Sequence, residues 1–196
     1  MASIRSYFYR VAADVGAIDL DDDLRLAGQN GDKEKVDDLI AGGAHAWTLD
    51  GELRRAAKNG ETEKVKNLIA AGADIHAGGD KALIEAAANG HADTVRALIK
   101  AGAKVHDRDD EALLLATKAG HTDCVKEIIA VPYSATSLYA VTPEAGKGPP
   151  EFYARLAEEN GHSDTAALLR TWQPRANPPA QQAPVLQPKP AAPRPM

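Results

Sequence analysis

The chain has 196 residues, of which 44% are hydrophobic and 5% aromatic, and its formal net charge is −5. This length allows one domain with a buried core, and the scarcity of aromatic residues favours small, closely packed helices. Cys124 is the single cysteine, so an intrachain disulfide is excluded, and no apolar run approaches the roughly 18 residues of a membrane-spanning helix. Residues 1–173 carry 20 basic against 28 acidic side chains, a balance that repels a phosphate backbone and argues against nucleic-acid binding.

Residues 1–20 are predicted to form an N-terminal segment that caps the following domain. Two arginines flank a short aromatic run and no long apolar stretch follows, so the segment does not resemble a secretory signal peptide. An Arg-containing, acid-poor start weakly resembles an organelle-targeting peptide, which is the alternative. We expect Tyr7, Phe8 and Tyr9 to pack onto the first helices.

A repeated unit occupies residues 21–173. Its register is given by five glycines spaced 29, 30, 30 and 41 residues apart: Gly31, Gly60, Gly90, Gly120 and Gly161. The first four copies align without a gap, as in LRRAAKNGETEKVKNLIAAGA and LIEAAANGHADTVRALIKAGA, and the fifth follows an insertion of 11 residues. We therefore predict five units, at about residues 21–49, 50–79, 80–109, 110–150 and 151–173.

Each unit is predicted to fold as two helices joined by the repeated glycine. In most units an apolar residue stands seven positions before this glycine, an alanine four before it and a valine five after it, so each helix has one apolar face. No unit can bury that face alone, so the units must stack. The predicted caps of the first helices are Asp21, Asp50, Asp80 and Asp110. The predicted caps of the second helices are Thr62, Thr122 and Ser163 at their starts and the left-handed glycines Gly43, Gly72 and Gly102 at their ends.

The pattern A-L-x-x-A-A-x-x-G-H-x-x-x-V-x-x-L-I-x-x-G-A resembles the ankyrin repeat. The resemblance covers about residues 21–173 and implies an all-α, ankyrin-type solenoid of about five helix–turn–helix repeats. The unit is near 30 residues rather than the usual 33 of the family and lacks its Thr-Pro-Leu-His start, so we expect short inter-repeat loops, or fingers.

The resemblance also implies a protein-binding concave face, built from the fingers and from the residues one and two before each repeated glycine. Several residues there vary between units while the apolar anchors do not, which suits partner recognition; the alternative is that they are merely solvated. The candidate partner-binding residues are Trp47, Glu52, Arg54, Arg55, Lys58, Asn59, Lys81, Asn89, Glu111 and Lys118. We place Trp47 in the first finger, where it forms a binding hot spot or packs on the adjacent finger, and Glu52, Lys81 and Glu111 in other finger positions.

The histidines occur one or two per unit and include His91, His121 and His162 directly after the repeated glycine. Repeat-related residues form a ladder with steps of about 8–10 Å, whereas metal ligands must converge at about 2 Å from the ion. We therefore expect loop-fixing hydrogen bonds and neither a metal site nor a cofactor. Cys124 is expected to be a packing residue, and no catalytic motif is present.

Two further segments depart from the repeat pattern. The loop at residues 130–153, rich in proline and tyrosine, either contacts a partner or packs on its own stack. Residues 174–196 contain eight prolines and are predicted to form a disordered tail with polyproline-II bias. The tail is a plain tether or, through Pro190, Pro193 and Arg194, a ligand for an SH3-type domain.

These observations lead to a non-enzymatic, cytoplasmic adaptor or scaffold, monomeric, that binds a protein partner rather than nucleic acid or membrane. The first alternative is an exported effector or regulator that uses the repeats to bind a target protein. The second is an enzyme that uses the loop at residues 130–153, for which the sequence offers no recognisable set of nucleophile, base and orienting group.

Overall fold

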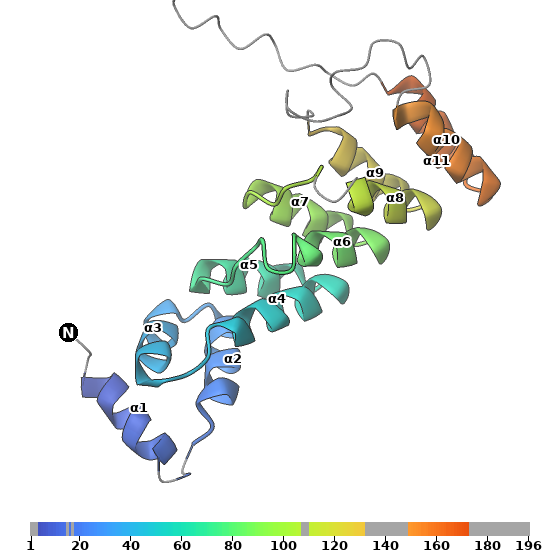
Figure 1. The fold of residues 1–196 in the computed structure, drawn as a ribbon. Helices are drawn as coiled ribbons and strands as arrows, with labels where there is room; N and C mark the ends of the chain where they lie inside the picture. Colours follow the sequence, from blue (N-terminus) through green and yellow to red (C-terminus); the bar gives the residue numbers. More distant parts are fainter. Residues whose placement is uncertain (1–3, 15, 17, 107–109, 132–148, 173–196) are drawn as a thin grey trace, which may run out of the picture.

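Helices succeed one another from Ile4 to Thr171 in the computed structural model, which describes residues 4–14, 16, 18–106, 110–131 and 149–172 (Figure 1). Within these ranges the chain forms eleven helices and no strand, so the predicted all-α class is confirmed. The helices are α1 (Ile4–Asp14), α2 (Leu20–Asn30), α3 (Lys33–Gly42), α4 (Trp47–Lys58), α5 (Thr62–Ala71), α6 (Lys81–Ala88), α7 (Ala92–Lys100), α8 (Glu111–Lys118), α9 (Thr122–Ile129), α10 (Pro149–Glu159) and α11 (Ser163–Thr171).

Helices α2 to α11 form five pairs that stack in single file (Figure 1). The even-numbered helices α2 to α10, here called the first helices, each contact the next even-numbered helix. The odd-numbered helices α3 to α11, here called the second helices, likewise contact one another in order. The molecule is therefore a two-layered helical solenoid, as the repeat predicts.

The core runs between the two layers and repeats with the units. The leucines seven residues before the repeated glycines are at most 1% exposed: Leu24, Leu53, Leu83 and Leu113. The valines five residues after these glycines are fully buried: Val36, Val65, Val95 and Val125. Burying one such side chain contributes about 1.5–3 kcal/mol, which accounts for the constancy of these positions from unit to unit. The predicted left-handed ends of the second helices are also confirmed, since Gly43, Gly72 and Gly102 have φ of 115°, 107° and 105°.

None of the four predicted aspartates caps a first helix through its side chain, although Asp80 and Asp110 do occupy the N-cap position. Asp21 and Asp50 lie inside α2 and α4, and α2 is capped by Asp19 instead. Asp80 and Asp110 directly precede α6 and α8 but make no capping hydrogen bond.

Three of these aspartates instead accept a backbone N–H from the loop that ends their own unit. The donors stand 24 residues further along: His45 for Asp21 and Asp74 for Asp50, both at 2.7 Å, and Lys104 for Asp80 at 2.8 Å. In these three units the aspartate thus links the end of the unit to its start. Its position just before an apolar run has the sequence pattern of a helix cap, but its hydrogen bond is to a distant loop.

The predicted caps of the second helices are also displaced. Thr62, Thr122 and Ser163 are the first residues of α5, α9 and α11 rather than the residues before them. Two of the hydroxyls reach the next unit, where Thr62 Oγ1 lies 2.8 Å from Thr94 Oγ1 and Thr122 Oγ1 lies 2.6 Å from Thr165 Oγ1. Because Thr94 and Thr165 are at most 1% exposed, these hydroxyl pairs join adjacent units away from water.

The N-terminal segment contains helix α1, which packs against α3 at one end of the stack (Figure 1). Ser6 is 1% exposed and Tyr9 packs on the core, as predicted for Tyr9. Tyr7 and Phe8 are 70% and 67% exposed, so the prediction that they pack inward is wrong. The reason is helical periodicity, which turns these two side chains away from the face that carries Ser6 and Tyr9.

Parts of two sequence predictions lie outside the described residues. Residues 132–148 of the insertion and residues 173–196, with the SH3-type motif at Pro190, Pro193 and Arg194, are among them. At the end of the last described helix, Trp172 is partly buried and packs on the core.

Candidate functional site

The last turns of α4, α6 and α8 present most of the exposed side chains predicted for partner binding. We call the exposed residues there the first-helix face: Arg54, Arg55, Lys58, Asn59, Asn89 and Lys118. The two asparagines are held locally, because Asn59 Nδ2 donates to Glu61 and Asn89 Nδ2 donates to the Glu85 carbonyl. The face is therefore brought together by stacking, although its members lie up to two units apart in sequence.

A ladder of histidines fixes the backbone beneath this face. Nε2 of His91 donates to the Lys58 carbonyl at 2.9 Å, and Nε2 of His162 donates to the Lys118 carbonyl at 3.0 Å. His121 makes the corresponding bond to the Ala88 carbonyl at 3.2 Å. The predicted loop-fixing role is thus confirmed, and each histidine holds the end of the first helix that precedes its own unit.

Four candidate residues lie in helices rather than in fingers, contrary to the prediction. Trp47 is the first residue of α4, Glu52 lies within α4, and Lys81 and Glu111 begin α6 and α8. Trp47 remains a large exposed side chain, 68% accessible, with its ring centroid 5.6 Å from that of His45. The first helix of the second unit starts earlier than its aspartate suggests, which moves Trp47 from loop to helix.

Glu52 is engaged within the stack instead of being free for a partner. Its side chain is 13% exposed, and its carboxylate accepts from Gln29 Nε2 at 2.7 Å and from Arg55 at 2.5 Å. Burial by itself would raise the pKa of the Glu52 carboxyl, but the hydrogen bonds from Arg55 and Gln29 leave this pKa below its ordinary value. Glu52 therefore joins the first two units and restrains Arg55.

Three exposed cations on the first-helix face have no such restraint. Arg54, Lys58 and Lys118 form no ion pair with any residue in the described part of the chain. Basic residues on the second helices differ, since Lys66, Arg96 and Lys126 each pair with an acid three positions earlier. These three second-helix cations are thus partly neutralised by their own helix, whereas Arg54, Lys58 and Lys118 are not.

Comparison with protein-family models matches the ankyrin-repeat model, described as ankyrin repeats in three copies, at residues 24–109 and 53–138. The two matches overlap and together span more than half of the chain. The chain belongs to the ankyrin-repeat family. Ankyrin repeats are general protein–protein interaction modules, and proteins of this family are typically non-enzymatic. A search of curated proteins finds no match.

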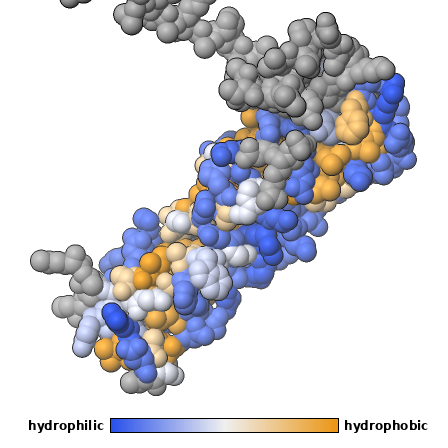
Figure 2. All heavy atoms as spheres, in the orientation of Figure 1, coloured by the Kyte–Doolittle hydropathy of each residue, from blue (hydrophilic) through white to orange (hydrophobic). Residues whose placement is uncertain are grey.

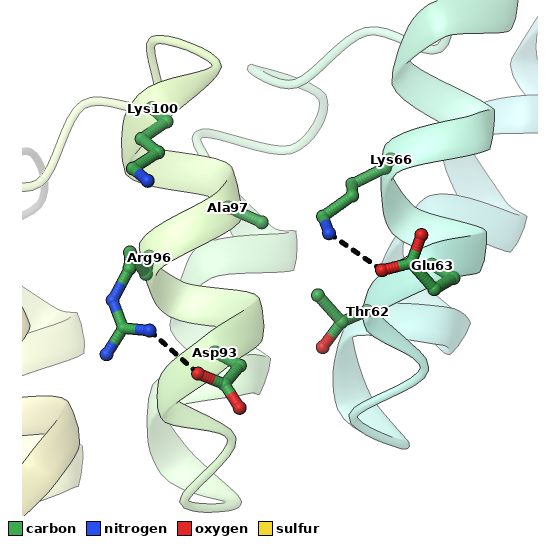
Figure 3. Close-up of a pocket in the computed structure, with 7 residues that line it drawn as sticks. All are labelled: Thr62, Glu63, Lys66, Asp93, Arg96, Ala97 and Lys100. Carbon is green, nitrogen blue, oxygen red and sulfur yellow. Dashed lines mark hydrogen bonds and ion pairs between the residues drawn. The ribbon is translucent and has the colours of Figure 1, made fainter.

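The ankyrin stack also has a groove on its second layer, between α5 and α7 (Figure 3). It has a volume of about 340 Å³ and is lined by Thr62, Glu63, Lys66, Asp93, Arg96, Ala97 and Lys100. Figure 3 shows that Lys66 reaches toward Glu63 and Arg96 toward Asp93, at distances of 2.7 and 2.8 Å. Arg96 also pairs with Glu127 at 2.7 Å. Because most of its charges neutralise one another, the groove offers a ligand little uncompensated charge.

The described residues of this ankyrin-repeat chain provide no reactive thiol, no cluster that could hold a metal ion and no membrane-spanning helix. Cys124 is 1% exposed, and burial raises the pKa of its thiol to about 11, so the nucleophilic thiolate is scarce at neutral pH. No group of three or more His, Cys, Asp or Glu in the described ranges could hold a metal ion. Nor does any described helix have the length and apolarity that crossing a membrane requires.

Exposed apolar side chains lie mainly toward the ends of the ankyrin stack. In Figure 2 hydrophilic residues dominate the middle of the visible face, and hydrophobic residues gather toward both ends. The large exposed ones are Tyr7, Phe8, Val11, Leu26, Ile40 and Trp47 in the first two units and α1, and Phe152 in α10. The middle of the visible face is therefore largely polar.

Proposed function

We propose that this chain is a non-enzymatic adaptor or scaffold that binds a protein partner through its first-helix face, with residues 21–173 as the binding domain. The proposal includes a cytoplasmic location, which a single cysteine permits. It rests on the family membership, because ankyrin repeats serve as protein–protein interaction modules.

One observation carries the choice of face. Two residues before the repeated glycines stand Gln29, Lys58, Ala88 and Lys118, so the residue type changes from each unit to the next, while the buried leucines five positions earlier are identical. Packing explains the constant positions but does not require particular residues at the variable ones. A surface that recognises one partner does require them.

The test is a comparison of two quadruple variants in affinity purification followed by mass spectrometry. The first replaces Lys58, Asn59, Asn89 and Lys118 by alanine on the first-helix face. The matched control replaces four exposed residues of the second layer by alanine: Glu63, Lys66, Arg96 and Lys126. Since the carbonyls of Lys58 and Lys118 that the histidines bind belong to the backbone, the first variant keeps those bonds.

We expect the first variant to lose the partners that the unaltered chain retains and the control to keep them. Far-UV circular dichroism should show the same helicity for all three chains. Retention of every partner by the first variant, with normal helicity, would remove the first-helix face as the binding site.

A further inference from the structure

The cations of the first-helix face occupy a defined spacing along the stack. Lys58 and Lys118 stand two residues before their repeated glycines, and the carbonyl of each is held by the histidine of a later unit. One first helix, α6, lies between α4 and α8 and contacts both. Neighbouring packed helices are about 8–10 Å apart, so the two lysines are separated by about 16–20 Å.

At the C-terminal ends of these helices the positive charge is concentrated at the two sides of this interval, and Lys81 lies at the opposite end of α6. Arg54 and Lys58 stand four residues apart on α4, on the same helix face, and Lys118 stands alone on α8. None of the three has an ion-pair partner within the described ranges, and the only acid on α6, Glu85, is partly buried and forms no ion pair there either. A bound segment could therefore bring carboxylates to both sides without displacing an existing partner.

At the registers of Lys58 and Arg54 the middle of the interval is small and apolar, and the exposed Asn89 beside it is polar but uncharged. At the position of Lys58, α6 carries the partly buried Ala88. At the position of Arg54, α6 carries Ile84, which is 6% exposed, and α8 carries Leu114, which packs partly on the core. Between its cations the surface thus suits an uncharged side chain.

We propose that the first-helix face binds an extended acidic segment of a protein partner, with carboxylates about five or six residues apart and an uncharged residue between them. The spacing follows from an extended chain, which advances about 3.3 Å per residue and so covers 16–20 Å in that number of residues. The segment runs along the stack, across α4, α6 and α8. This inference rests on the proposed function and specifies the chemistry of the partner.

The experiment selects from a library of random peptides of about 16 residues, displayed on phage and panned against the full chain. A charge-reversed variant carries Arg54→Glu, Lys58→Glu and Lys118→Glu. The matched control carries Lys66→Glu, Arg96→Glu and Lys126→Glu, which changes the net charge by the same amount on the other layer. Circular dichroism and thermal unfolding establish that both variants are folded.

We expect the unaltered chain and the control to enrich acidic peptides with two groups of carboxylates at the stated spacing. The reversed variant should not enrich them, and the best peptide should bind it at least about tenfold more weakly, since three exposed ion pairs become repulsive contacts. Raising the ionic strength from about 0.15 M to about 0.5 M should weaken binding to the unaltered chain, because salt screens exposed charges.

Enrichment of neutral or basic peptides, or no enrichment, would overturn the proposal that the face binds an acidic segment. If neutral peptides bind and the quadruple alanine variant of the first-helix face loses them, the proposed function stands and only this inference fails. If acidic peptides bind the reversed variant equally well, the assigned face is wrong. Binding of a single-stranded oligothymidylate as tight as that of the best peptide would also overturn it, because a phosphate backbone would then satisfy the cations.

Discussion

Replacing Gly60 by alanine tests how adjacent units are joined. Gly60 has φ of +72°, in the left-handed region, and a Cβ added there would lie 2.8 Å from Cε1 and Cγ of the His91 ring. That ring belongs to the next unit, and its Nε2 donates to the Lys58 carbonyl at 2.9 Å. The variant Gly60→Ala must therefore displace a side chain that bonds one unit to another.

The expected loss has two parts. A left-handed conformation costs alanine about 1–2 kcal/mol, of which about 0.4–1 kcal/mol is offset because alanine restricts the unfolded chain. Displacing the ring removes a hydrogen bond of about 1 kcal/mol and forces a strained rotamer of about 1 kcal/mol. The free energy of unfolding should thus fall by about 2–3 kcal/mol.

Gly161 supplies the matched control at the same position of the last unit. Its φ is +81°, and no atom of the described residues lies within 4 Å of an added Cβ. Gly161→Ala carries the backbone strain alone and should cost about 0.5–1 kcal/mol. The difference between the two variants isolates the contact with the histidine ring.

Urea unfolding followed by far-UV circular dichroism measures both variants, together with His91→Ala and the double variant Gly60→Ala/His91→Ala. With the ring removed, Gly60→Ala should cost no more than Gly161→Ala, which gives a coupling of about 1–2 kcal/mol between positions 60 and 91. Equal losses for Gly60→Ala and Gly161→Ala, or no coupling with His91→Ala, would show that the His91 ring does not oppose the added methyl group.

Two more predictions concern buried groups. Asp80 is 2% exposed, has φ of 55° and accepts the Lys104 N–H, so Asp80→Ala should lower the free energy of unfolding by about 2–3 kcal/mol. Asp80→Asn keeps an acceptor and tolerates this φ, so it should cost less than about 1 kcal/mol. Thermal unfolding measures both variants, and equal losses would contradict a role for the Asp80–Lys104 hydrogen bond. The pKa of Cys124 is raised by burial from 9.0 to about 11, so its contribution to stability should be complete below pH 9.0 and disappear as the pH rises to about 11. Between pH 9.0 and 11 the free energy of unfolding should fall with pH in the unaltered chain and fall less in Cys124→Ala. At pH 8 a disulfide reagent should label Cys124 far more slowly in the folded chain than in the unfolded chain, and rapid labelling of the folded chain would contradict the burial of Cys124.

Much of the architecture could be predicted because the same residue pattern recurs in each repeat. Leu53 and Val65 recur at fixed distances from Gly60, and the same distances recur around Gly90, so the helix pairs and their buried faces follow from periodicity alone. The hydrogen-bonding role of His91 was likewise predictable, since a ladder cannot converge on one metal ion.

The roles of several polar residues could not be predicted in this way. An aspartate before an apolar run has the sequence pattern of a helix cap, yet Asp50 accepts the N–H of Asp74, 24 residues away. Trp47 was predicted in a finger, but α4 begins with it. The local sequence around Asp50 or Trp47 does not specify where the neighbouring loop lies, and the position of that loop determines which atoms come into contact.

The repeated apolar pattern is enough to predict that this chain is a stack of helix pairs, because each pair has an apolar face that only its neighbours can bury. The pairing of charges between units emerges only from the packing: Arg96 of α7 lies 2.7 Å from Glu127 of α9, whereas Lys58 meets no carboxylate within the described residues. The physical reason is the range of the interactions. Burial follows from local periodicity, but pairing over less than 4.0 Å depends on where side chains of different turns and units come to lie.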